Sequence, residues 1–203
     1  MPGRLPLRLS AAEWRAVLEW FVRGAPSAEI ARETGLDRKR VLRALLVVRQ
    51  AMLRSTAAQL RRPTRAAERS HADGRQRAAA LGLHVNNGDA WADVISDAEA
   101  EQLGRRLRER KNRQSLSGSG SPYAAVVYRG RLYRVDHANL DRTPFGRVEA
   151  FWAYLQRQLR SKGGIRRERL GLYLADFAWR YNHRKLARSE QVRQLLTLIR
   201  GPR

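Results

Sequence analysis

The chain has 203 residues, with 41 Lys+Arg against 19 Asp+Glu and a formal net charge of +22. It contains no cysteine, which excludes disulfides and any cysteine-ligated zinc site. No apolar run approaches the ~20 residues of a membrane span and no signal-peptide core is present, so we expect a cytoplasmic, nucleoid-associated protein without a membrane partner.

The positive charge predicts a polyanionic partner, and double-stranded DNA is the first candidate. The excess is almost entirely arginine, which genome composition can also favour. Charge alone therefore does not decide the partner, and the arrangement of the basic residues has to be considered.

Residues 1–56 predict a helix-turn-helix domain. The stretch "LSAAEWRAVLEWFVRG" begins with the capping box Ser10 and Glu13 and ends at Gly24, as an amphipathic helix would. The following "SAEIARETGLDRKRVLRALLVVRQAML" predicts a second helix, a tight turn and a third helix. The residues with helix-turn-helix spacing are Ala31, Gly35 and Val41, and the expected buried face between the helices is Ile30, Leu36 and Leu45.

Basic residues cluster where the third helix begins. The candidate DNA-binding residues, which follow Asp37, are Arg38, Lys39, Arg40 and Arg43. Arginine can read guanine through two hydrogen bonds, and Lys39 is better suited to a phosphate. The alternative is an ordinary three-helix packing unit with a solvated basic face, but the position of the cluster favours DNA binding.

The middle of the chain predicts a change to mixed α/β structure. Residues 57–80 are a basic linker interrupted by Pro63. The "NNG" that follows predicts a hairpin with strands near 81–85 and 90–95. Ser96 and Glu99 form a second capping box that predicts another helix, and "SLSGSGSP" predicts a flexible loop. The segment "YAAVVYRGRLYRVDH" predicts a short apolar helix or strand and then a strand.

The acidic residues of the second half do not show a metal-binding pattern. The acids that could in principle hold a divalent metal are Asp89, Asp93, Asp97, Asp136, Asp141 and Glu149. Their spacing does not require it, because carboxylates in turns and first helical turns are usually structural. The histidines lie too far apart for a local zinc motif; they are His71, His84, His137 and His183.

Amphipathic helices are predicted near the carboxyl end. The inward stripe of residues 147–160 is Val148, Phe151, Trp152, Leu155 and Leu159. The inward stripe of the next helix is Leu170, Tyr173, Leu174, Phe177 and Tyr181. Residues 187–203 form a separate carboxyl-terminal segment, in which a helix begins at Ser189.

Two motifs in these helices resemble a known family. The stretch "VEAFWAYLQRQL" followed by "LGLYLADFAWRYNHRK" is similar to the end of bacterial insertion-sequence transposases with an ISXO-like domain. The resemblance covers the chain from about Leu9 to Lys185 and includes the amino-terminal helix-turn-helix. It implies a shortened RNase H-like domain over residues 81–186, in a helix-rich α/β protein. It also implies an Asp-Asp-Glu triad that holds two Mg²⁺ ions for phosphoryl transfer, with Glu149 as its third acid.

The sequence departs from the family at the other triad positions. Ala67 falls where the family has its first Asp, and Gly118 where it has the second; Gly146 and Gln156 replace an Asn and a Lys around Glu149. We therefore expect a transposase-derived DNA-binding protein without strand-transfer activity, in which Glu149 is a remnant and no cofactor is held.

Two alternatives remain. One is an active Asp-Asp-Glu transposase that uses Mg²⁺, in which Asp73, Asp93 or Asp136 replaces a missing acid. The other is a helix-turn-helix transcriptional regulator or scaffold whose carboxyl-terminal module binds protein or forms a homodimer.

Overall fold

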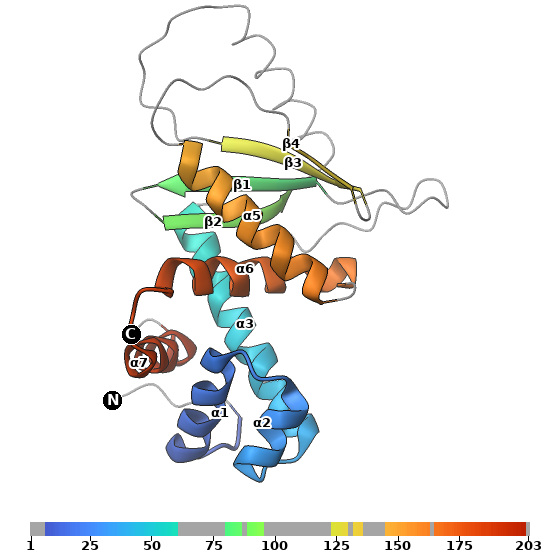
Figure 1. Cartoon of the computed structure of the whole chain (residues 1–203). Coiled ribbons are helices and arrows are strands. Elements are labelled where there is room, and N and C mark those ends of the chain that lie inside the picture. Colours follow the sequence, from blue (N-terminus) through green and yellow to red (C-terminus); the bar gives the residue numbers. More distant parts are fainter. Residues whose placement is uncertain are drawn as a thin grey trace, which may run out of the picture. The chain divides into compact units, whose positions relative to one another are not determined.

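The computed structural model describes residues 7–60, 80–86, 89–95, 123–129, 132–135, 145–162 and 165–201 (Figure 1). Within these ranges the chain forms six helices and four strands, so it is α/β and helix-rich, as the sequence predicts. It divides into two compact units. Unit 1 comprises residues 1–62 and 183–203, and unit 2 comprises residues 63–182. None of the described helices is both long enough and apolar enough to cross a membrane.

Unit 1 is built from four helices: α1 (Ala11–Arg23), α2 (Ser27–Thr34), α3 (Arg38–Leu60) and α7 (Arg188–Arg200). Helices α1, α2 and α3 contact one another pairwise, and α7 packs against α1 and α3. Helix α3 continues four residues beyond the expected end of this domain at residue 56. Thr56, in these last turns, is buried.

The core of unit 1 contains the residues that the sequence predicts. Ile30, Leu36, Val41 and Leu45 are all buried between the helices. The other large buried side chains of its described residues are Leu9, Trp14, Val17, Leu18, Phe21, Val48, Met52, Val192, Leu195 and Ile199. The last three form one stripe of α7. The sequence treats residues 187–203 as a separate segment, whereas the structure groups α7 with unit 1.

Unit 2 contains an antiparallel sheet of β1 (Ala80–Asn86), β2 (Asp89–Ile95), β3 (Tyr123–Arg129) and β4 (Leu132–Val135), in the order β2-β1-β3-β4. The predicted hairpin is confirmed, because β1 and β2 pair in antiparallel register from Ala80↔Ile95 to Asn86↔Asp89. Residues 123–129 form a strand rather than the short helix that the sequence also allows. The helix expected after Ser96 lies outside the described residues.

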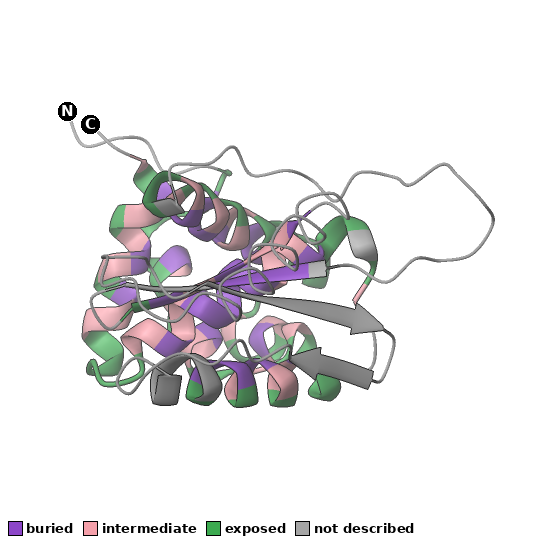
Figure 2. Ribbon diagram, turned by 90° about the horizontal axis from the view of Figure 1, so that it is seen from above, coloured by how far each residue is buried: buried purple, intermediate pink, exposed green. Residues whose placement is uncertain are grey.

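The described part of unit 2 also contains two helices, α5 (Phe145–Ser161) and α6 (Arg167–His183). Side chains at alternate positions of β1 and β2 face these helices, as the two-residue period of a strand requires. The buried cluster that results is Leu81, Leu83, Ala90, Ala92, Phe151, Trp152, Leu155, Leu159, Leu170, Leu174, Phe177, Ala178 and Tyr181 (Figure 2). The cluster confirms both inward stripes apart from two residues: Tyr173 is only partly buried and packs against the cluster, and the side chain of Val148 is not described.

Candidate nucleic-acid interface

The turn between α2 and α3 is fixed by two residues. Gly35 ends α2 with φ of 66°, in the left-handed region that glycine adopts at low cost. Asp37 then caps α3, since its Oδ1 accepts hydrogen bonds from the backbone N–H groups of Lys39 at 2.8 Å and Arg40 at 3.3 Å. The first turn of α3 therefore has a defined position and direction.

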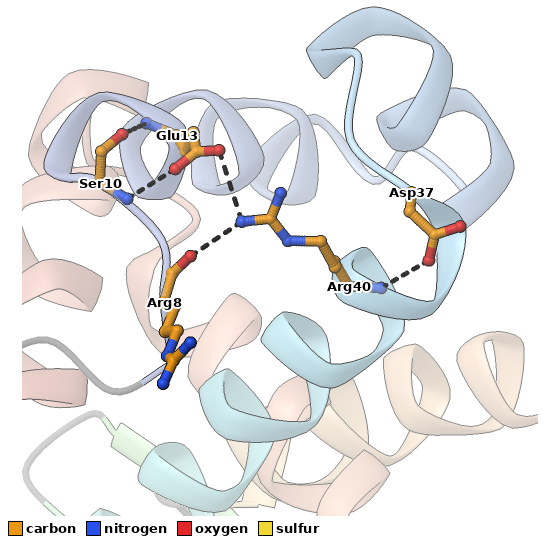
Figure 3. A network of polar contacts seen from close by, with 5 residues as sticks. All are labelled: Arg8, Ser10, Glu13, Asp37 and Arg40. Carbon is orange, nitrogen blue, oxygen red and sulfur yellow. Dashed lines mark hydrogen bonds and ion pairs between the residues drawn. The ribbon is translucent and has the colours of Figure 1, made fainter.

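The start of α3 is also linked to the start of α1 (Figure 3). Arg40 Nη2 donates a hydrogen bond to the carbonyl oxygen of Arg8 at 2.8 Å and lies 3.6 Å from Glu13 Oε1. Glu13 in turn forms the predicted capping box. Its Oε2 accepts from the Ser10 N–H at 2.6 Å, and its own N–H donates to Ser10 Oγ at 3.1 Å.

These contacts stabilise the charged form of Glu13. The hydrogen bond from the Ser10 backbone N–H lowers the pKa of Glu13 below its usual value, and the Ser10 side chain and the Arg40 charge act in the same direction. The guanidinium of Arg40 thus has two structural partners at the start of α1, the Arg8 carbonyl oxygen and the Glu13 carboxylate.

One face of α3 is exposed and carries no acid. Its residues are Lys39, Leu42, Arg43, Leu46 and Gln50, all of them exposed. They share a face because residues three, four, seven and eleven positions apart lie along one side of a helix. We call these five residues the α3 outer face. The whole sequence of α3, "RKRVLRALLVVRQAMLRSTAAQL", lacks Asp and Glu, so no acid on the helix offsets the positive charge of this face.

The predicted DNA-binding residues divide into two groups. Arg38, Lys39 and Arg43 are exposed at the start of α3, and the last two belong to the α3 outer face. The Arg40 side chain is 45% exposed, but its guanidinium bonds Arg8 and approaches Glu13. These bonds favour a positioning role for Arg40, whereas the other three side chains are presented to solvent.

Sequence reasoning did not select Leu42, Leu46 or Gln50. Helical periodicity could have placed these three residues on the exposed side of α3. The buried side of this helix is already occupied by Val41, Ala44, Leu45 and Val48. The run "VLRALLVV" is apolar at so many positions that the two exposed leucines are hidden among buried ones.

The candidate catalytic acid cannot be assessed from side-chain geometry. Glu149 lies in the second turn of α5, but its side chain is outside the description, as are Ala67 and Gly118. Asp89 is exposed at the beginning of β2, and Asp93 is half-buried on the same strand. Among the side chains that the structure describes, no group of three His, Asp or Glu residues could hold a metal ion. The triad and its loss both remain predictions.

The end of α6, which carries the "LADFAWRYN" motif, makes structural contacts within its own helix and with α5. Arg180 Nε donates to Asp176 Oδ1 at 2.7 Å, and the Asp176 side chain is only 3% exposed. The Tyr181 ring packs against Phe151 and Tyr154 of α5, with centroid distances of 4.9 Å and 5.3 Å.

Asn182, the last residue of this motif, joins α6 to the sheet. Its Oδ1 accepts from the Ala90 N–H at 2.8 Å, and its Nδ2 donates to the Ala90 carbonyl oxygen at 3.0 Å. Packing and hydrogen bonding within unit 2 are thus sufficient to explain the residue types Arg-Tyr-Asn at these positions.

Comparison with protein-family models, with characterised proteins and with solved structures gives no match to this chain. Within the described surface, the α3 outer face is where residue types and geometry together point to one kind of partner.

Proposed function

We propose that this protein binds double-stranded DNA through unit 1, with α2, the Gly35 turn and α3 acting as a helix-turn-helix. The observation that carries the proposal is the α3 outer face, an exposed cationic surface on an acid-free helix that directly follows a fixed turn. A helix of this kind fits the major groove with its first turns against the base edges. The net charge of +22 supports the same partner.

The side chains at the start of α3 have separate roles in this proposal. Arg43, from the middle of the outer face, donates its guanidinium hydrogen bonds to a base edge, with guanine O6 and N7 as the best-matched acceptors. Lys39 and Arg38 neutralise phosphates. Arg40 holds α3 against α1 through Arg8 and Glu13, and so sets the angle at which the helix is presented.

For unit 2 we propose a degenerate transposase domain that lacks strand-transfer activity. The support comes from the resemblance of the α5 and α6 sequences and from the absence of acids at the matching positions, Ala67 and Gly118. An RNase H-like sheet also contains parallel strands, whereas every described strand pair in unit 2 is antiparallel. Because the described strands show none of the parallel pairs of an RNase H-like sheet, the transposase-domain proposal has less support than DNA binding by unit 1, which is the central part of the proposal.

The DNA-binding proposal is tested by removing two cations from the α3 outer face. The variant Lys39→Ala/Arg43→Ala should bind a fluorescein-labelled duplex at least about tenfold more weakly than the parent at fixed salt, because one phosphate contact and one base contact are lost. The slope of log affinity against log salt concentration should also become less negative, by about 0.9 for the one phosphate contact that is lost.

A matched control removes the same charge elsewhere. Arg15 on α1 and Arg157 on α5 are exposed, so Arg15→Ala/Arg157→Ala changes the net charge equally without altering the α3 outer face. Fluorescence anisotropy should give nearly parental affinity for this control. Equal weakening in both double variants would show that binding depends on total charge, and the proposed interface would be rejected.

The absence of strand-transfer activity is tested separately. Linear DNA carrying candidate transposon ends, incubated with the protein and Mn²⁺, should remain intact, because two-metal chemistry needs three carboxylates around the ions. Nicking that disappears in Glu149→Gln would establish the active-transposase alternative instead. Variants of Asp93 and Asp136 would then identify the other acids.

A further inference from the structure

Two large apolar side chains are exposed in the middle of the α3 outer face. Leu42 is 48% exposed and Leu46 is 41% exposed, and they lie one turn apart with Arg43 between them. Neither is needed for the core of unit 1, because Val41, Leu45 and their neighbours fill the opposite side of the helix. A single exposed leucine is common on protein surfaces, but two of them a turn apart with cations beside them form one apolar patch rimmed by polar side chains, which is the kind of patch that marks interaction sites.

The charges around the leucines restrict what that partner can be. Lys39 and Arg43 are exposed beside them on the same face. In a two-fold dimer the same patch would meet itself, and these cations would be brought close to their own copies. A duplex avoids this conflict because phosphates surround the groove that the helix enters. The major groove also offers one apolar group on its base edges, the 5-methyl group of thymine.

We infer that Leu42 and Leu46 contact thymine methyl groups in the major groove, and that they give the protein a preference for sites with thymine beside the base read by Arg43. This inference depends on the proposed DNA binding and adds its sequence preference. Burying one methyl group against a leucine side chain is expected to change affinity about fourfold, so two contacts change it on the order of tenfold or more.

Deoxyuridine provides a direct test, because it differs from thymidine at the base edge only by the missing methyl group. Duplexes are first selected by the parent protein from a random-sequence library. The best binder is then synthesised with thymine or with uracil at every T position. The parent should bind the uracil duplex about fourfold more weakly for each contacted methyl, and the selected sites should contain thymine at fixed positions.

The variant Leu42→Ala/Leu46→Ala should bind the two duplexes equally, since alanine preserves the helix but is too short for the contact. Leu7 and Leu186 are exposed leucines outside α3, so Leu7→Ala/Leu186→Ala is the matched control and should keep the parental preference for thymine.

The outcomes separate this inference from the function on which it depends. If the parent binds DNA but does not distinguish thymine from uracil, the leucine contact is wrong while DNA binding stands. If the parent binds no duplex, both proposals fail. Sedimentation of the parent protein and of Leu42→Ala/Leu46→Ala gives a third outcome. If the parent is a dimer and the variant a monomer, the leucines join two copies of the chain, and the methyl contact is rejected.

Discussion

The side-chain amide of Asn182 pairs with the backbone of Ala90 as a neighbouring strand would, accepting from its N–H and donating to its carbonyl oxygen. Ala90 lies on β2, the outermost strand on one side of the described sheet. Unpaired groups on such an edge invite pairing with another chain. Asn182 occupies the hydrogen-bonding groups of Ala90 and fixes the end of α6 to the sheet at the same time.

Replacing Asn182 by leucine should remove both hydrogen bonds. Because each contributes about 1 kcal/mol, the free energy of unfolding of unit 2 should fall by about 2 kcal/mol. Exchange of the Ala90 amide hydrogen, followed by NMR, should become faster than in the parent. The control Arg157→Leu changes an exposed polar side chain of the same unit and should stay within about 0.5 kcal/mol. Unchanged protection at Ala90 would contradict the pairing.

Leu195 of α7 is fully buried in unit 1, so Leu195→Ala should leave a cavity next to α1 and α3. The expected loss is about 2–5 kcal/mol. Urea unfolding followed by the indole NMR signal of Trp14 reports on unit 1 directly. Leu186→Ala, at an exposed leucine just before the helix, is the control. If Leu195→Ala unfolds at the same urea concentration as the parent, α7 does not stabilise this unit.

Trp152 and Phe177 lie in the core cluster of unit 2, from α5 and α6 respectively. Truncating either to alanine should cost about 3–5 kcal/mol, because the transfer free energy is lost and a cavity remains. Trp152→Phe should cost less, since most of the apolar volume is retained. Thermal melts of the three variants test this order. If Trp152→Ala melts like the parent, α5 is not held by this core.

Glu13 predicts a pH dependence of stability. Its pKa is lowered in the folded protein by the Ser10 hydrogen bonds and the Arg40 charge. At this site the folded state therefore binds fewer protons than the unfolded state at the same acidic pH. The stabilisation is therefore fully present above the usual glutamate pKa of 4.5 and is lost as the pH falls through the lower folded value.

Melting temperatures of the parent and Glu13→Gln between neutral and acidic pH measure this effect. The parent should be more stable near neutral pH, and the difference should vanish in acid. Glu19→Gln, on an exposed glutamate of the same helix, removes the same charge without touching the capping box and is the control. If the difference in melting temperature between the parent and Glu13→Gln persists in acid, the stabilisation comes from packing rather than from charge.

The sequence predicts local structure well where one residue type has a strong physical preference. The Ser10–Glu13 capping box, the Gly35 turn and the "NNG" hairpin all depend on neighbours within a few residues. The buried stripes of α5 and α6 follow from helical periodicity in the same way.

Local patterns do not predict which residues far apart in the sequence contact each other. Asn182 and Ala90 are 92 residues apart, and nothing in either local sequence specifies the other. The stripe Val192, Leu195 and Ile199 shows that α7 has a buried side, but not that its partners are α1 and α3. At the candidate site, periodicity places the cations at the start of α3, whereas the Arg40 link to α1 requires the tertiary structure.

The packing of α7 on α1 and α3 has a consequence for synthesis on the ribosome. At about 5–20 residues per second, the chain between Leu60 and Arg188 takes on the order of ten seconds to make. Before α7 is made, α1 and α3 have left the ribosome, but the apolar surface that Val192, Leu195 and Ile199 later cover is still open to water and to chaperones. The nascent protein therefore has its cationic helix before it has the helix that completes the surrounding core.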